Sequence, residues 1–187
     1  WLNNGPVSLG SPPNSLVEFA VIENMSEKKV CVIGAFATGK TSLIAQFIEG
    51  TYSDSYQTTI GVRIDQKQVV TAQATIDVVL WDIHGEDKFQ HLRMSYLRGT
   101  AAYILVVDGT RKASLTTAID LHTEVTQRIG HIPCMMVINK CDLQADWEIT
   151  EEDIAVLKAQ NYELIRTSAK TGTGVERCFS QLIEKLT

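Results

Sequence analysis

Short apolar runs alternate along the chain with longer segments in which apolar residues recur every three or four positions. Apolar runs predict buried strands, and the longer period predicts helices that pack one face on a core. The pattern predicts strands near 29–34, 61–71, 75–82, 101–108, 133–139 and 163–167. It predicts helices near 40–49, 87–97, 113–129, 150–159 and 173–186.

The alternation of strands and helices predicts an α/β fold with a mostly parallel sheet and helices on both faces. The segments near 61–71 and 75–82 are too close in sequence for a crossover helix. They are therefore expected to form an antiparallel hairpin at one edge of the sheet. The expected architecture has three layers, with six strands, one of them antiparallel at the edge, and five helices.

Two local patterns concern the fourth predicted helix and the first residues of the chain. Thr150 with Asp153 predicts a capping box. Residues 1–24 contain three of the four prolines and are expected to form a linker or leader, with a folded domain over 25–187. Met25 is a candidate natural start, and a native extension is the alternative.

Composition narrows the class of protein. The chain has 187 residues, of which 44% are hydrophobic and 21% charged, as expected for one globular domain. Its net charge of −5 argues against nucleic acid as a partner. The sequence has no apolar run long enough for a transmembrane span and no C-x-x-C pair among its four cysteines. A cytoplasmic location is expected.

The stretch Gly34–Thr41 carries the pattern G-x-x-x-x-G-K-[ST] between a predicted strand and a predicted helix. Glycines let successive backbone N–H groups surround a phosphate at the start of the helix. Lys40 would add a charge between the β- and γ-phosphates, and Thr41 a hydroxyl for Mg²⁺. A glycine turn before a core helix is the alternative, but the complete pattern favours nucleotide binding.

A second motif, Asn139-Lys140-Cys141-Asp142, follows a predicted buried strand. A carboxylate at Asp142 can accept hydrogen bonds from N1–H and the exocyclic amine of guanine, a pair that adenine does not offer. Facing adenine, this carboxylate would be desolvated without a partner. The motif therefore favours a guanine nucleotide.

Over residues 28–187 the chain resembles the Ras-like small GTPases, and most closely the Rab group. The resemblance rests on five motifs in the family's order: Gly34–Thr41, Thr58-Thr59-Ile60-Gly61, Trp81-Asp82-Ile83-His84-Gly85, Asn139–Asp142 and Ser168-Ala169-Lys170. It implies a P-loop G domain that binds GTP or GDP with Mg²⁺, hydrolyses GTP, and changes two switch loops when the γ-phosphate is lost.

The resemblance also implies roles for individual residues. Thr41, Thr59 and Asp82 would hold Mg²⁺, and Lys40, Gly85 and Glu86 would act at the γ-phosphate. Nucleotide contacts are implied for Gly34, Ala37, Thr38, Gly39, Lys40, Thr41, Ser42, Tyr52, Thr59, Gly85, Asn139, Lys140, Asp142, Ser168, Ala169 and Lys170. Ser168 is expected to support its loop rather than act as a nucleophile, because no histidine and aspartate are placed to activate it.

Three departures from the family pattern gather at the expected γ-phosphate position. Glu86 replaces the glutamine that orients the attacking water, and a carboxylate cannot donate to a developing oxyanion. His84 replaces a small alanine, and Phe36 stands where relatives have a small residue that leaves room for an activating arginine. Slow hydrolysis and a poor response to activating proteins are expected.

Effector proteins are expected to bind a surface that contains Ile64, Trp81 and Tyr96, which fall at the positions of the family's aromatic cluster, with Ile64 in place of a phenylalanine. The alternative is that Trp81 and Tyr96 simply complete the core. An exchange factor and an activating protein are further expected partners. The sequence ends without the cysteine tail of lipid-anchored relatives. This is compatible with a cytoplasmic protein, or with a peripheral membrane protein whose lipidated tail was removed.

Three other functional hypotheses stay open at the level of sequence. One is a GTP-binding scaffold with negligible hydrolysis, favoured by Phe36, His84 and Glu86. Another is a P-loop kinase or ATPase, which the motif Asn139–Asp142 disfavours. The third is a GTPase module from a larger multidomain protein.

Overall fold

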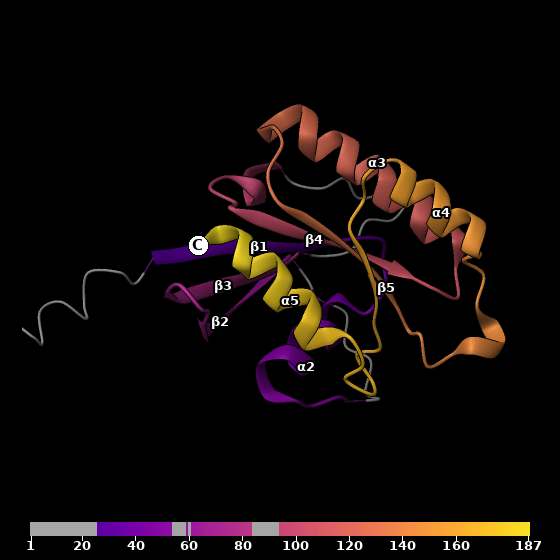
Figure 1. Cartoon of the computed structure of the whole chain (residues 1–187), viewed down its shortest axis with the longest axis horizontal. Coiled ribbons are helices and arrows are strands. Elements are labelled where there is room, and N and C mark those ends of the chain that lie inside the picture. Colours follow the sequence, from indigo (N-terminus) through magenta and orange to yellow (C-terminus); the bar gives the residue numbers. More distant parts are fainter. Residues whose placement is uncertain (1–25, 54–58, 60, 84–93) are drawn as a thin grey trace, which may run out of the picture.

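A central sheet is covered by helices on both faces in the computed structural model (Figure 1). The structure describes residues 26–53, 59, 61–83 and 94–187. The expected linker 1–24 and most of the predicted helix near 87–97 lie outside these residues.

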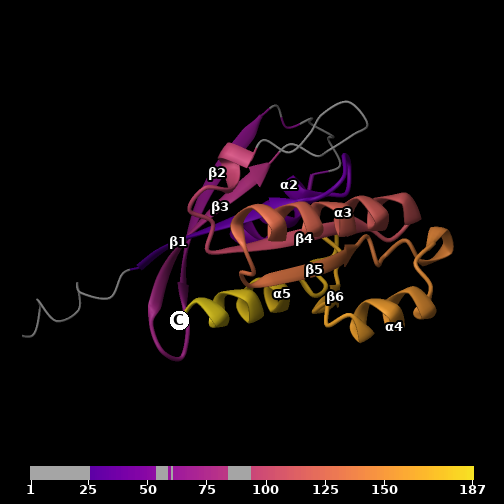
Figure 2. The same cartoon turned by 90° about the horizontal axis from the view of Figure 1, so that it is seen from above.

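The sheet has six strands in the order β2-β3-β1-β4-β5-β6. Only β2 and β3 pair antiparallel, and every other neighbouring pair is parallel. The predicted six-stranded sheet with an antiparallel hairpin at one edge is therefore confirmed, and Figure 2 shows that hairpin away from β6. The strands are β1 Ser26–Ile33, β2 Val62–Val70, β3 Thr75–Ile83, β4 Ala102–Asp108, β5 Cys134–Asn139 and β6 Leu164–Arg166.

Four α-helices lie within the described residues, where five helices were expected in the whole chain. They are α2 Lys40–Glu49, α3 Lys112–Ile129, α4 Glu151–Ala159 and α5 Val175–Ile183. Short 3₁₀ helices occupy η1 Met94–Leu97, η2 Gln144–Asp146 and η3 Glu184–Leu186.

The ends of two predicted helices, η1 and η3, form short 3₁₀ helices. The Lys29 ammonium donates to the backbone oxygens of Tyr96 in η1 and of Arg98 just after it, at 2.6 and 3.0 Å. Those carbonyls are thereby satisfied without a continuing α-helix. Gly99 follows with a φ of 74° and turns the chain toward β4.

Each face of the sheet carries its own hydrophobic core. Helices α2 and α5 pack on one face, where the rings of Phe47 and Phe179 stack with centroids 4.0 Å apart. Helices α3 and α4 pack on the other face around Leu121 and Leu157. Alternate residues of β1 and β4 enter the two cores, so these central strands are buried on both faces.

The predicted capping box at α4 is confirmed. The Thr150 hydroxyl accepts from the backbone N–H of Asp153 at 3.1 Å, and the Asp153 carboxylate accepts from the backbone N–H of Thr150 at 2.9 Å. Ile149 and Ile154 are buried on either side of the cap, as a hydrophobic staple requires.

All four cysteines are free thiols, and Cys31 and Cys178 are buried. Burial raises the pKa of Cys178 to about 12, which disfavours its thiolate. Among the described helices, none has the length and apolar character needed to cross a bilayer.

Candidate functional site

Loops that follow four parallel strands meet at one edge of the sheet. The loops begin after Ile33 in β1, Asp108 in β4, Asn139 in β5 and Arg166 in β6. In open α/β sheets the carboxyl ends of the strands form the usual ligand site. The predicted phosphate and base motifs therefore lie on the same edge.

The phosphate loop is closed by contacts that only glycine permits. A Cβ on Gly34 would lie 2.3 Å from the backbone oxygen of Val106, and one on Gly39 would lie 2.5 Å from Nδ2 of Asn139. Gly39 also has a φ of 92° and stands immediately before α2. The loop thus turns tightly into the helix N-terminus, where free backbone N–H groups favour an anion.

Lys40 points its ammonium back into this loop. Its Nζ donates to the backbone oxygens of Gly34 and Ala35 at 3.1 and 2.9 Å, and the residue is only 6% exposed. The Thr38 hydroxyl donates to the backbone oxygen of Ala35 and completes the turn. A buried positive charge inside a ring of backbone groups is suited to a phosphate.

Three oxygen-bearing side chains predicted to bind metal come together beside the loop. The Thr41 hydroxyl lies 2.8 Å from that of Thr59 and donates to Oδ2 of Asp82 at 2.5 Å. Oδ1 of Asp82 is buried and has no hydrogen-bond partner among the described residues. Burial raises the pKa of Asp82, and a hydrogen bond from Thr41 opposes that shift.

These donors fit a magnesium ion. Hydroxyl and carboxylate oxygens are the ligands that Mg²⁺ prefers, and it is usually held by one or two carboxylates. A cation beside Oδ1 would satisfy a buried oxygen that has no hydrogen-bond partner among the described residues and would favour the charged form of Asp82.

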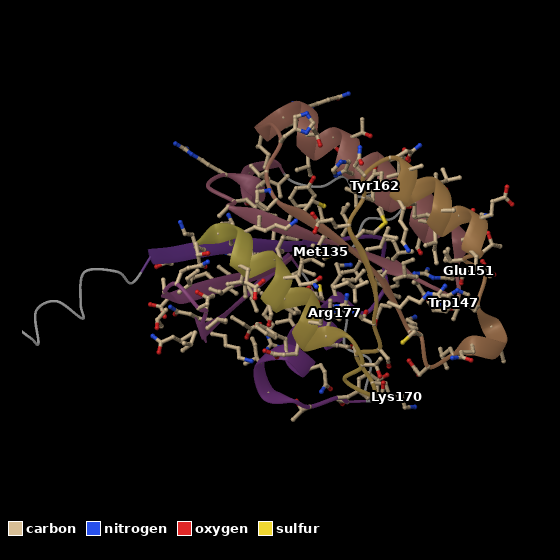
Figure 3. All side chains as sticks on the ribbon, viewed as in Figure 1. Met135, Trp147, Glu151, Tyr162, Lys170 and Arg177 are labelled. Carbon is tan, nitrogen blue, oxygen red and sulfur yellow. The ribbon has the colours of Figure 1, made fainter. Side chains whose placement is uncertain are left out.

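A pocket adjoins the phosphate loop where the base motif was predicted. Most of its lining had been predicted to contact nucleotide, and Leu143 had not. Lys170, labelled in Figure 3, belongs to the loop between β6 and α5 that forms one side of this pocket. The lining residues are Gly39, Ser42, Tyr52, Asn139, Lys140, Asp142, Leu143, Ala169 and Lys170.

The side-chain amide of Asn139 connects the loops around this pocket by hydrogen bonds. Its Nδ2 donates to the backbone oxygen of Thr38 at 3.0 Å. Its Oδ1 accepts from the Thr167 hydroxyl at 3.2 Å and from the backbone N–H of Ala169 at 3.1 Å. One buried amide therefore joins the phosphate loop, β5 and the loop after β6.

Asp142 is exposed at the pocket and is oriented by Ser168. The buried Ser168 hydroxyl donates to Oδ1 of Asp142 at 2.6 Å and accepts from the backbone N–H of Thr171 at 3.1 Å. Ser168 thus supports both the loop and the Asp142 carboxylate.

Three residues expected at the γ-phosphate, His84, Gly85 and Glu86, lie outside the described residues. Phe36 is described, and 36% of its surface is exposed. Its backbone oxygen accepts a hydrogen bond from Arg111 at 2.5 Å. This contact between the phosphate loop and the start of α3 was not expected from the sequence.

The expected effector surface is partly core and partly exposed. Trp81 and Tyr96 are half-buried against the core of α3 and α4, with ring centroids 6.4 Å apart. Ile64 lies opposite Trp81 in the β2–β3 register and is 52% exposed. The Lys29 ammonium lies 3.4 Å from the Trp81 ring centroid, close enough for a cation–π contact. Trp81 and Tyr96 therefore complete part of this core, and their contact with effectors stays a prediction.

The sequence analysis also missed Asp108 and Arg111. Asp108 is only 1% exposed and accepts hydrogen bonds from Arg111 and Lys140 at 3.0 and 2.7 Å. One signal in the sequence could have identified Asp108, because it comes directly after a buried apolar run. Asn139 has the same position after the neighbouring strand, and the two residues are paired in the sheet.

Comparison with known proteins agrees with the motifs. The Ras family model matches residues 29–187. The Ras-related protein Rab-1 of Theileria parva is 36% identical over 166 residues, which cover 84% of this chain and 73% of the relative.

Two further relatives come from a plant and a fish. RABC2a of Arabidopsis thaliana is 34% identical over 162 residues, covering 84% of this chain and 77% of the relative. Rab-4A of Danio rerio is 32% identical over 160 residues, covering 84% and 75%. The chain therefore belongs to the Ras family and is a Rab-like, GTP-binding small GTPase.

Proposed function

We propose that the chain is a molecular switch that binds GTP or GDP with Mg²⁺, hydrolyses GTP slowly and presents nucleotide-dependent loops to effectors. The observation that carries the proposal is the pocket shared by Gly39 of the phosphate loop and Asp142 of the base motif. A nucleotide lying across Gly39 would bring its base to Asp142 and its phosphates to Lys40.

Recognition of guanine is assigned to Asp142, and its carboxylate is held at the pocket by Ser168. It would accept from the two N–H groups on the guanine edge. Tyr52, Ala169 and Lys170 would surround the base, since they line the same pocket. Asn139 would act indirectly, by keeping the loops in register.

Phosphate binding is assigned to the loop Gly34–Thr41 and to the Lys40 ammonium. Lys40 already satisfies two loop carbonyls, so it enters the phosphate site with its position fixed and loses little freedom on binding. Thr41, Thr59 and Asp82 would hold Mg²⁺, which when bound neutralises charge on the β- and γ-phosphate oxygens.

The switch property is assigned to Thr59 and to the segment that contains Gly85. The Thr59 hydroxyl is 3.4 Å from Asp82, and Asp82 is in β3 immediately before that segment. A ligand that contacts Thr59 and Gly85 only in the triphosphate state would shift both loops together. Effectors would then bind beside Ile64, Trp81 and Tyr96.

Slow hydrolysis is assigned to Glu86, with Lys40 and Gly85 stabilising charge at the γ-phosphate. A carboxylate can accept a hydrogen bond from water but cannot donate to the oxyanion that develops. A GTP-binding scaffold with negligible turnover is the second candidate, and the same residue together with Phe36 favours it. Phosphate release in a single turnover separates the two functions.

The remaining assignments follow from the family. We place the GTPase domain over 25–187 and the protein in the cytoplasm or at the surface of a membrane. An exchange factor and an activating protein would be its regulators, and nucleic acid is not assigned as a partner.

Competition for bound nucleotide tests the guanine assignment. Fluorescently labelled GDP on the full chain should be displaced by GTP, whereas the same concentration of ATP should have no effect. The expected discrimination is about 10⁴-fold, because adenine would leave the Asp142 carboxylate without a partner. Equal displacement by ATP would contradict the assignment and favour a P-loop kinase or ATPase.

A further inference from the structure

The Asp108 side chain lies at the end of β4, between the phosphate loop and the base motif. Its Oδ1 accepts from the backbone N–H and the hydroxyl of Thr110 at 3.0 and 2.8 Å. Its Oδ2 accepts from Nε of Arg111 at 3.0 Å and from Nζ of Lys140 at 2.7 Å. A single buried carboxylate therefore holds two cations from different loops.

The backbone beneath this carboxylate is itself fixed. The buried Ser114 hydroxyl accepts from the backbone N–H of Asp108 at 2.9 Å and lies 3.1 and 2.7 Å from the backbone oxygens of Asp108 and Arg111. Gly109 packs so closely on Trp147 that a Cβ would come within 2.0 Å of the ring. Burial disfavours ionisation, but hydrogen bonds from Lys140 and Thr110 outweigh it and lower the pKa of Asp108. The carboxylate is thus a rigid, charged acceptor at neutral pH.

Arg111 extends this arrangement to the phosphate loop. While Nε binds Asp108, the terminal NH2 nitrogen donates to the backbone oxygen of Phe36 at 2.5 Å. The amide of Asn139 independently binds the backbone oxygen of Thr38. The phosphate loop is therefore anchored at two of its carbonyls, and one anchor depends on Asp108.

Lys140 provides the connection to the base pocket. It lines the pocket together with Asp142, and its ammonium is held by Asp108. Without a carboxylate at position 108, the cations of Arg111 and Lys140 would repel each other in a partly buried space. Each would then gain by turning toward water.

We propose that Asp108 is a positioning residue for nucleotide binding, which holds Arg111 on the phosphate loop and Lys140 on the base pocket. The inference rests on the proposed guanine-nucleotide site. It predicts that this carboxylate slows the release of GDP and GTP alike, because neither anchor involves the γ-phosphate.

Release of a fluorescent GDP analogue, chased with excess unlabelled GDP, tests the proposal on the full chain. Asp108→Asn should accelerate release about tenfold to hundredfold, as expected for hydrogen bonds to charged groups. Arg111→Gln should accelerate it by up to about tenfold. The double variant should release no faster than Asp108→Asn, since Arg111 acts through the carboxylate.

Lys112→Met is the matched control. Lys112 is the neighbour of Arg111 and forms an ion pair with Asp153, away from the pocket. Its loss should leave the release rate within about twofold of the wild type. The melting temperature of each variant without nucleotide is measured in parallel, because a purely structural role would lower that temperature without changing release.

The outcomes are distinguishable. A wild-type chain that does not bind GDP would refute the proposed function itself. Binding with unchanged release in Asp108→Asn and Arg111→Gln would overturn the positioning role, as would additive effects in the double variant. If Asp108→Asn does not fold, Arg111→Gln decides alone, because that side chain is 44% exposed and its removal leaves the core intact.

Discussion

Two buried side chains, Asn139 and Asp108, connect the loops that meet at the carboxyl edge of the sheet. Asn139 uses its amide to join the phosphate loop to the loop after β6. Asp108 uses its charge to join the same loop to the base motif through Arg111 and Lys140. Pocket residues such as Asp142 thus depend on buried side chains that hold the surrounding loops together.

The proposed slow hydrolysis also rests on a single residue, Glu86. Glu86→Gln should raise the single-turnover rate about tenfold, because an amide can orient water and also donate to the γ-phosphate. The wild type should lie at or below about 10⁻⁴ to 10⁻³ s⁻¹, as for unassisted relatives. Phosphate release after mixing with GTP and Mg²⁺ measures the single-turnover rate of the wild type and of Glu86→Gln.

Glu184→Gln is the control for this change, since Glu184 lies in η3 beyond the last α-helix. It should not alter the rate. A wild-type rate well above this range, or a Glu86→Gln variant that is no faster, would refute the assignment of slow hydrolysis to the carboxylate.

Sequence motifs predicted those site residues whose spacing is fixed within one loop. Gly39, Lys40 and Asp142 could be assigned because short motifs place them without knowledge of the fold. Arg111 could not, because its contact is with Phe36, 75 positions away, and neither residue belongs to a motif that implies the other.

At the scale of elements, the ends of helices depended on tertiary contacts. The start of α4 was predictable because Thr150 and Asp153 form a local cap. The 3₁₀ form of η1 was not, because it depends on the distant Lys29 ammonium. The periodicity of a helix is a local property of the sequence. Whether its last turn is α-helical or 3₁₀ depends on which groups donate hydrogen bonds to the last backbone carbonyls.

The cap of α4 should give stability a definite pH dependence. Hydrogen bonds, first from Lys112 and then from the Thr150 backbone, lower the pKa of Asp153 to about 2. A folded pKa below the unfolded value of about 4 means that this stabilisation is complete above pH 4 and is lost toward pH 2.

Asp153→Asn should therefore lower the melting temperature at pH 7, and its difference from the wild type should shrink as the pH falls through that window. Asp120→Asn, an exposed change within α3, provides the control and should have little effect at any pH. A difference that grows on acidification would contradict the role of the charged cap.

At the scale of the whole molecule, both hydrophobic cores hold the loops of the candidate site in place. The core of α2 and α5 supports the phosphate loop through the buried Leu43 and Ile44. Both cores support Asp108 and Asn139, because alternate residues of β4 and β5 enter each core. The pocket proposed to bind nucleotide lies among these loops, so ligand binding should stabilise the whole domain.

The strands of the sheet were predictable from the hydrophobic pattern, whereas their order in the sheet was not. Two strands close in sequence predict the β2–β3 hairpin directly. The position of β1 between β3 and β4 depends on which face each crossover helix covers, and periodicity alone does not specify the face. Family resemblance supplies that information only because the motifs identify the fold.

The nucleotide preference of Asp142→Asn is the most direct test of the central claim, that the chain is a guanine-nucleotide switch. Replacing the carboxylate by an amide changes two acceptors into an acceptor and a donor. Affinity for GTP should fall by at least about a hundredfold, and affinity for xanthosine triphosphate should rise.

Asp146→Asn, in the neighbouring η2 helix and outside the pocket lining, is the control and should keep the preference of the wild type. Competition against a labelled nucleotide measures all three proteins. The predicted result is that only Asp142→Asn changes its preference from GTP to xanthosine triphosphate. Unaltered GTP affinity in that variant would contradict the account.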